Sequence, residues 1–185
     1  LKCELQRLSD AGFAEVVLVG INLSAYGTDI GLSICDAVEL ADRMNFRRVR
    51  LGSLEPDHIT DEVIDRLAKL PSFCPQFHIS LQSGCNNTLK AMNRHYSAEE
   101  YFELCQKLRA SFPEATITTD IMVGFPTESE EDFAENVRFA QKIGFEKVHV
   151  FPYSPREGTK AAKMPQIEKA IKEKRSHIMI EKTEE

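Results

Sequence analysis

The sequence predicts an α/β fold, specifically a partial, open TIM-type barrel of parallel βα units. Three observations predict it. Five short apolar segments alternate with amphipathic helical segments along the chain, and this repeated order produces right-handed crossovers and a parallel sheet. A further helical segment precedes the first apolar one, so the pattern calls for a missing first strand and a total of six βα units. No GxGxxG follows the first apolar segment, which argues against a dinucleotide-binding fold.

The expected strands are rich in Val, Ile and Phe, and several are apolar on both faces. This pattern is typical of parallel strands that helices cover on both sides. The strands are Glu15–Gly20, Arg48–Leu51, Phe77–Leu81, Thr116–Val123 and Lys147–Phe151.

The expected helices begin at residues that commonly cap helices. In order they are Leu1–Ala11, Ile34–Met44 after Ser33, Asp61–Lys69 after Thr60, Ala98–Ser111 after the capping-box spacing Ser97-x-x-Glu100, a helix from the similar spacing Thr127-x-x-Glu130 to about Lys142, and a charged helical tail from about Gln166 to Glu185.

The composition describes one ordinary globular domain of 185 residues, 42% hydrophobic and 28% charged, with enough chain to bury a core. The formal net charge is −6, whereas most nucleic-acid-binding domains are basic, so we do not expect this segment to supply the main grip on a nucleic acid. No apolar run approaches the ~20 residues of a membrane span. The chain starts at Leu1 without a signal-like segment, and we expect it to be part of a larger protein.

The cysteines are odd in number and irregularly spaced, which argues against a disulfide framework, and no two are close enough in sequence for a zinc ribbon or a cluster-binding loop. They are Cys3, Cys35, Cys74, Cys85 and Cys105. We interpret them as reduced, mostly buried thiols of a cytoplasmic protein.

Polar loops follow every expected strand. They are Gly20–Gly27, Gly52–His58, Ser80–Asn86, Gly124–Ser129 and Phe151–Ala162. Ligands of parallel α/β folds gather at the carboxyl ends of the strands. Five such loops on one rim therefore predict a binding site.

Together these segments resemble, in order, the motifs of the radical-SAM methylthiotransferases. The matching segments are Val16–Asn22 with Tyr26-Gly27, His78 with Gln82-Ser83-Gly84, Thr119–Glu128, and Phe151–Ala161. The resemblance covers nearly the whole chain. One departure is Thr127, where the family usually has glycine.

The resemblance implies that residues 1–185 are a radical-SAM barrel core, without the first strand, the cluster loop, the N-terminal cluster domain or the C-terminal RNA-binding domain. It implies S-adenosylmethionine (SAM) and two 4Fe-4S clusters as cofactors, with the cluster ligands outside this segment. It also implies a tRNA substrate and an electron donor in the full-length transferase. The segment alone is expected to be inactive, with no catalytic residue and no metal ligand, and the oligomeric state stays open.

Within the family, Arg48–Pro56 and Ile59–Glu62 resemble the branch that methylthiolates carbon-2 of N6-threonylcarbamoyladenosine next to the tRNA anticodon. The isopentenyladenosine branch and the ribosomal-protein aspartate branch are the alternatives within the family. A non-redox TIM-barrel protein that binds a phosphate or a sugar is the alternative outside it.

Most candidate cofactor-binding residues lie at the strand ends. By resemblance, Asn22 would contact the amino or carboxylate group of SAM, and Glu55 the amino group or a polar group of the substrate. Gln82 and Ser83 suit the ribose diol. For these four residues the structural alternatives are an Asx-turn, a solvated carboxylate and helix capping.

Five further residues complete the set. Asp120 lies inside an apolar strand, where a carboxylate requires a ligand, a cation or a hydrogen-bond network. Gly124, Phe125 and Pro126 form a turned apolar edge suited to adenine, or a simple strand-to-helix turn. Arg156 suits a carboxylate or a phosphate, with a surface ion pair as its alternative.

Overall fold

The computed structural model describes residues 1–184, which divide into two compact units. Unit 1 consists of Leu1–His78 and Gln106–Thr116, and unit 2 consists of Ile79–Cys105 and the chain from Ile117 onward. Both contain parallel strands with helices between them in sequence. No helix of the described chain is long and apolar enough to cross a membrane.

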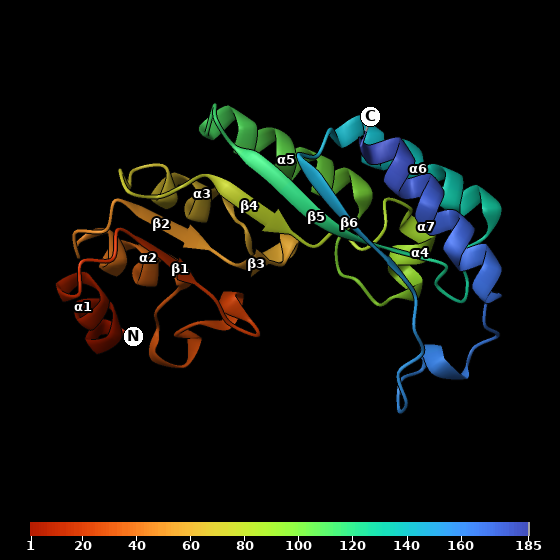
Figure 1. Cartoon of the computed structure of the whole chain (residues 1–185), viewed down its shortest axis with the longest axis horizontal. Coiled ribbons are helices and arrows are strands. Elements are labelled where there is room, and N and C mark those ends of the chain that lie inside the picture. Colours follow the sequence, from red (N-terminus) through yellow and green to blue (C-terminus); the bar gives the residue numbers. More distant parts are fainter. Residues whose placement is uncertain (185) are drawn as a thin grey trace. The chain divides into compact units, whose positions relative to one another are not determined.

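Unit 1 contains a parallel strand pair, β1 (Glu15–Leu18) and β2 (Arg48–Leu51), in which Glu15 lies opposite Arg48 (Figure 1). The other elements of this unit are α1 (Lys2–Asp10), α2 (Ile34–Asp42), β3 (Ser53–Leu54), α3 (Asp61–Leu67) and most of β4 (Gln76–Ile79). Fully buried side chains such as Leu5, Val38 and Val49 form its core.

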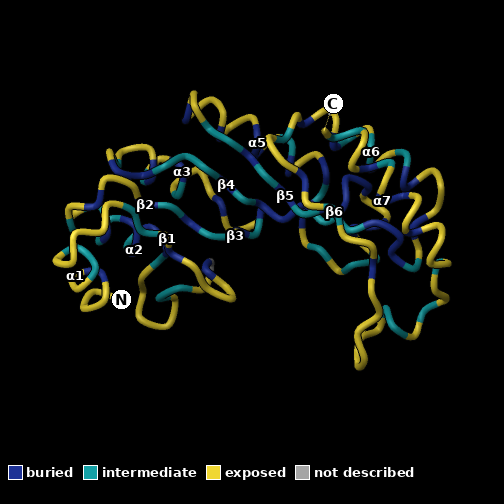
Figure 2. The backbone as a smooth tube through the Cα atoms, viewed as in Figure 1, coloured by how far each residue is buried: buried dark blue, intermediate teal, exposed yellow. Residues whose placement is uncertain are grey.

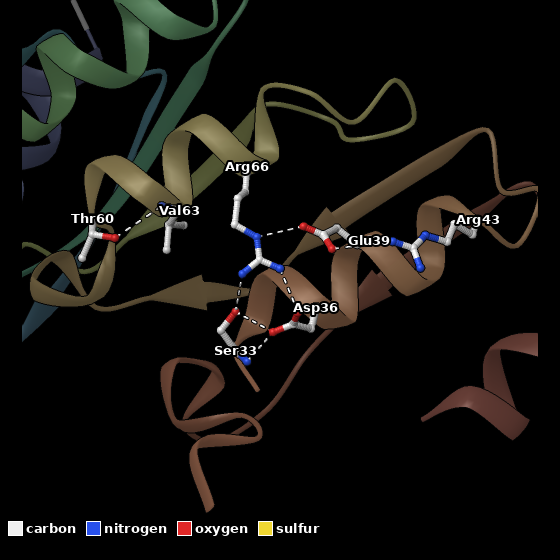
Figure 3. A network of polar contacts seen from close by, with 7 residues as sticks. All are labelled: Ser33, Asp36, Glu39, Arg43, Thr60, Val63 and Arg66. Atoms are coloured by element: carbon white, nitrogen blue, oxygen red, sulfur yellow. Dashed lines mark hydrogen bonds and ion pairs between the residues drawn. The ribbon is translucent and has the colours of Figure 1, made fainter. Parts of the chain in front are cut away.

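The helices α2 and α3 are joined by a polar network around Arg66 (Figure 3). Its guanidinium donates to Glu39 and Asp36 at 2.8 Å each, and to the Ser33 hydroxyl at 3.3 Å. Ser33 and Asp36 form a capping box at the start of α2, and the Thr60 hydroxyl accepts from the Val63 N–H at the start of α3. Both predicted N-caps are confirmed.

Unit 2 is built on β5 (Thr116–Val123) and β6 (Lys147–Pro152), which are parallel and place Asp120 opposite His149. Its helices are α4 (Asn86–Ala91), the first part of α5 (Ala98–Ser111), α6 (Glu130–Ile143) and α7 (Lys169–Glu184). The helix α7 packs on α6 and β6. The segment between β6 and α7 is mostly exposed, and is drawn largely in yellow in Figure 2.

The five expected strands and six expected helices are all present, and Arg48–Leu51, Thr116–Val123 and Ala98–Ser111 have the expected bounds. Three details differ. The strands do not form a single sheet, because β1 and β2 make a separate two-stranded sheet while β3 and β4 belong to another. The short elements β3 and α4 were not expected. The capping box of α6 pairs Ser129 with Asp132, two residues later than the expected spacing from Thr127.

Candidate functional site

Unit 2 holds a cavity of about 610 Å³ at the carboxyl ends of its strands. Its polar lining consists of Gln82, Arg94, Asp120, Ser154, Arg156 and Thr159, and its apolar lining of Met122, Phe151, Pro152, Tyr153 and Ala161. Three sequence-predicted residues, Gln82, Asp120 and Arg156, therefore meet around one space. A mixture of a few polar groups with aromatic and aliphatic side chains is typical of a small-molecule site.

The strand β5 presents Asp120 to this cavity through its alternation. Its even-numbered residues are half-buried while Ile117, Thr119, Ile121 and Val123 are buried. Since successive side chains of a strand point to opposite faces, Asp120 and Met122 lie on the same face, and both line the cavity. The carboxylate is thus at a cavity wall rather than in a sealed core.

Gln82 reaches the cavity from a left-handed backbone, with φ of 66°. Its N–H donates to the Asp120 carbonyl at 2.8 Å, and its own carbonyl accepts from the Met122 N–H at 2.9 Å. A non-glycine residue in this region costs roughly 1–2 kcal/mol, and such strain is concentrated at functional sites. Its pairing with β5 holds this backbone in place.

Ser83 does not line the cavity. Its side chain is fully buried, and its hydroxyl accepts from the Cys85 N–H at 3.2 Å. The next residue, Gly84, donates its N–H to the Asn136 side-chain oxygen at 2.7 Å. Ser83 therefore shapes the turn that carries Gln82.

The turn after β5 borders an adjoining cavity of about 310 Å³, which shares Gln82, Met122 and Tyr153 with the first and is also lined by Phe125. The Phe125 ring meets the Tyr153 ring edge-on, with centroids 5.2 Å apart. Gly124 has φ of +72°, and a Cβ there would lie 2.5 Å from Cγ of Lys172. Glycine is thus required at this turn.

Arg156 lies in the exposed loop after β6. Its carbonyl accepts from both the N–H and the hydroxyl of Thr159, at 3.2 and 2.7 Å, which closes the loop beside the cavity. Arg94 is a lining residue that sequence reasoning missed. It follows the unexpected helix α4 and the left-handed Asn93, and a short polar segment such as NNTLKA carries little periodic signal.

The two remaining candidates, Asn22 and Glu55, belong to unit 1. Asn22 follows β1 and is exposed, and its side-chain oxygen accepts from the Ala25 N–H at 3.3 Å in a turn. Glu55 follows β3 and is half-buried at the start of a short 3-10 helix, Pro56–His58. Each stands at a strand end, as expected, and Asn22 has the turn contact that was its structural alternative.

The described cysteines do not form a cluster site. Cys35, Cys85 and Cys105 are buried, Cys3 is exposed and Cys74 is half-buried. Burial raises the pKa of the Cys85 thiol, whose Sγ lies 3.2 Å from a carboxylate oxygen of Asp132. Among residues 1–184, no group of three or more His, Cys, Asp or Glu side chains is arranged to hold a metal ion. These residues therefore do not fit an iron–sulfur cluster.

Comparison with known families decides the identity of the fold. Residues 4–140 match the sequence model of the Radical SAM superfamily. The chain belongs to this superfamily. Its members use SAM and a 4Fe-4S cluster, and the cavity of unit 2 fits the first of these cofactors, because amide, carboxylate and aromatic groups suit an adenosyl group.

The chain is similar to curated methylthiotransferases. It is 36% identical to the threonylcarbamoyladenosine tRNA methylthiotransferase MtaB of Thermotoga maritima, over 100% of this chain and 43% of that protein. It is 39% identical to the tRNA-2-methylthio-N(6)-dimethylallyladenosine synthase of a Thermoanaerobacter species, over 96% of this chain and 39% of that protein. The chain thus spans about two fifths of these relatives. The resemblance to methylthiotransferases is confirmed.

Solved structures support the same fold. The radical SAM methyltransferase TsrM of Kitasatospora setae, with cobalamin and a [4Fe-4S] cluster bound, matches 81% of this chain and 29% of its own with a TM-score of 0.64 and 15% identity. The archaeal Elp3 of Methanocaldococcus infernus matches 98% of this chain and 47% of its own, with a TM-score of 0.56 and 17% identity. The predicted fold class, a partial TIM-type arrangement of parallel βα units, is confirmed.

Proposed function

We propose that this chain is the barrel core of a tRNA methylthiotransferase, and that the cavity of unit 2 binds the adenosyl part of SAM. One observation carries the proposal: Gln82 and Asp120 line the same cavity, beside aromatic side chains, at the carboxyl ends of radical-SAM strands. The radical-SAM relatives named above act on tRNA adenosines.

Each candidate residue of unit 2 has a role in this proposal. Gln82 and Asp120 bind the ribose hydroxyls, and the buried Ser83 fixes the turn that carries Gln82. Gly124, Phe125 and Pro126 provide the apolar edge for adenine. Arg156 binds a carboxylate or a phosphate. Together they orient the ligand and exclude water, which is the usual contribution of a protein to cofactor chemistry.

SAM supplies the radical initiation and the methyl group in this chemistry, whereas the residues that the structure describes do not fit a cluster. We further propose that the full-length protein adds an N-terminal cluster domain, a C-terminal RNA-binding domain, two 4Fe-4S clusters and an external electron donor. The segment 1–185 alone would then be inactive.

As the substrate we propose N6-threonylcarbamoyladenosine next to the tRNA anticodon, methylthiolated at carbon-2. The segment Arg48–Pro56, which includes β2, β3 and Glu55, supports this branch by its resemblance. Relatives from both adenosine branches have similar identity, so a direct test is needed. The full-length enzyme is expressed in a host that lacks both activities, and tRNA nucleosides are measured by mass spectrometry. A methylthio group on threonylcarbamoyladenosine supports the proposal, whereas one on dimethylallyladenosine alone overturns this branch.

SAM binding itself is tested by calorimetric titration of the reconstituted full-length protein. Loss of one hydrogen bond to a ligand costs about 0.5–3 kcal/mol, so Asp120→Ala should weaken binding roughly two- to hundredfold. Asp61→Ala is the control, because Asp61 lies in unit 1 and is exposed. Binding of a phosphate or a sugar without any binding of SAM would instead favour the non-redox alternative.

A further inference from the structure

We propose that Lys172 and Arg175 of α7 are positioning residues for the cavity of unit 2. They hold the turn after β5 and the turn after β6 in the geometry that lines it. Both lie beyond residue 140, where the match to the superfamily ends. The inference rests on the proposed function, in that SAM is the ligand whose binding these turns would control.

Arg175 reaches the turn after β5 through Glu128. Its side chain is 5% exposed, and its Nη1 donates to Oε2 of Glu128 at 2.7 Å and to the Glu128 carbonyl at 3.0 Å. The same Oε2 accepts from the Gly124 N–H at 2.7 Å. A short chain of charge-assisted hydrogen bonds, which are stronger than neutral ones, thus runs from α7 to the backbone of Gly124. The second nitrogen, Nη2, donates to Glu130 at 2.7 Å and fixes the guanidinium plane.

Lys172 contacts both turns. It is buried, and its ammonium donates to the Tyr153 carbonyl at 3.0 Å and lies 5.2 Å from the centroid of the Tyr153 ring. Its methylene groups lie so close to Gly124 that a Cβ there would be 2.5 Å from Cγ of Lys172. One side chain therefore limits the position of Gly124 and of Tyr153 together.

The two turns are also coupled to each other. The Tyr153 N–H donates to the Val123 carbonyl at 2.9 Å, and the rings of Tyr153 and Phe125 are in edge-to-face contact. Both rings border the space that Gln82 lines. A displacement of either turn would move an aromatic wall of the proposed adenine site.

Stability alone is a weak reason for these buried charges. Removing a cation and a carboxylate from water is costly, and well-packed apolar side chains often stabilise a fold equally well. Burial also raises the pKa of Glu128, although Gly124 and Arg175 both favour its carboxylate. Apolar side chains, however, could not donate to the Tyr153 carbonyl. Nor could they hold the Glu128 carboxylate, which accepts from the Gly124 N–H. The charges fix backbone positions.

The test uses reconstituted full-length protein with Arg175→Met or Lys172→Met, at a temperature well below the melting temperature of every variant. We expect the Kd for SAM to rise roughly tenfold or more in both. Hydrogen exchange without ligand should increase in residues 123–129 and 151–155 and not throughout unit 2. Arg66→Met is the matched control, because it breaks an ion-pair network of unit 1. It should lower the melting temperature and leave the Kd within about twofold of wild type.

If both α7 variants bind SAM as wild type does while melting earlier, or if exchange rises evenly across unit 2, the two cations are structural only and the inference is wrong. Should Arg175→Met fail to fold, Lys172→Met and Glu128→Gln decide, since the glutamine keeps the shape and an acceptor oxygen. A wild-type protein that binds no SAM would overturn the proposed function instead. The local exchange pattern would still decide the positioning role.

Discussion

The N–H of Gln82 donates to the carbonyl oxygen of Asp120 at 2.8 Å. This bond joins two residues that lie 38 positions apart in the sequence and brings their side chains to one cavity. The backbone of Gln82 has a left-handed conformation. Its effect on stability and the effect of the side chain on SAM binding can therefore be tested separately.

Gln82→Gly should relieve the backbone strain at this position and remove the side chain that is proposed to bind SAM. Glycine adopts positive φ without the penalty of a side chain but has more entropy to lose on folding, so stability should change by less than about 1 kcal/mol in either direction. Affinity for SAM should fall roughly two- to hundredfold. Asn45→Gly is the control, because Asn45 has φ of 61° in unit 1. Thermal melts and SAM titrations check both variants, and unchanged SAM affinity in Gln82→Gly would remove Gln82 from the site.

Gly124→Ala should destabilise unit 2 more than Gly158→Ala does. Both glycines have positive φ, at +72° and +84°, but only at position 124 would the new Cβ meet another atom, Cγ of Lys172 at 2.5 Å. We expect about 1–3 kcal/mol of overpacking at Gly124 beyond the backbone strain that the two substitutions share. Urea denaturation of the two variants measures the difference. Equal losses would show that Lys172 yields to the added methyl group.

Ser83→Ala should lower stability by about 1–3 kcal/mol, because it leaves the buried Cys85 N–H without the hydroxyl that accepts from it. Ser83→Cys, which keeps a weak acceptor, should lose less. Chemical denaturation tests this order, and an alanine variant as stable as wild type would contradict the role of Ser83 in the turn.

Acid unfolding should report the network around Arg66. Hydrogen bonding to Arg66, with help from Ser33, lowers the pKa of Asp36 from 3.8 to about 2. A carboxyl whose pKa is lower in the folded state contributes stability above its unfolded pKa, and this is lost as pH falls through the folded value. Wild type should therefore lose stability between about pH 4 and pH 2 more steeply than Asp36→Asn. Denaturant midpoints measured across this range provide the test, and equal slopes would contradict it.

Much of the fold could be predicted from the sequence, because its signals are local. Apolar segments such as Thr116–Val123 and caps such as Ser33 and Thr60 act within a few residues. The start of α6 was misassigned, because Thr127-x-x-Glu130 and Ser129-x-x-Asp132 both fit a capping pattern. The structure uses the second, while Glu128 is engaged by Gly124 and Arg175. Arg175 of α7 lies more than 40 residues from Ser129 in the sequence, so no local pattern could indicate this contact.

The candidate site was predictable by position but not by orientation. Strand ends identified Gln82 and Arg156, and a carboxylate inside an apolar strand identified Asp120; all three line one cavity. The sequence could not show that Ser83 is buried while its neighbour Gln82 lines the cavity. A shift of one residue along an extended chain reverses the direction in which a side chain points. The C-terminal segment was expected to be a charged helix, and its sequence does not indicate that Arg175 is buried. Burial of a cation depends on a tertiary partner, here Glu128.

The binding of SAM in the cavity of unit 2 is tested most directly by a hydrogen-exchange footprint. Reconstituted full-length protein is compared with and without saturating SAM. We predict protection in residues 80–84, 118–126 and 151–156, and none in the Arg66 network between α2 and α3. SAM that binds with no protection of these three segments would contradict the account.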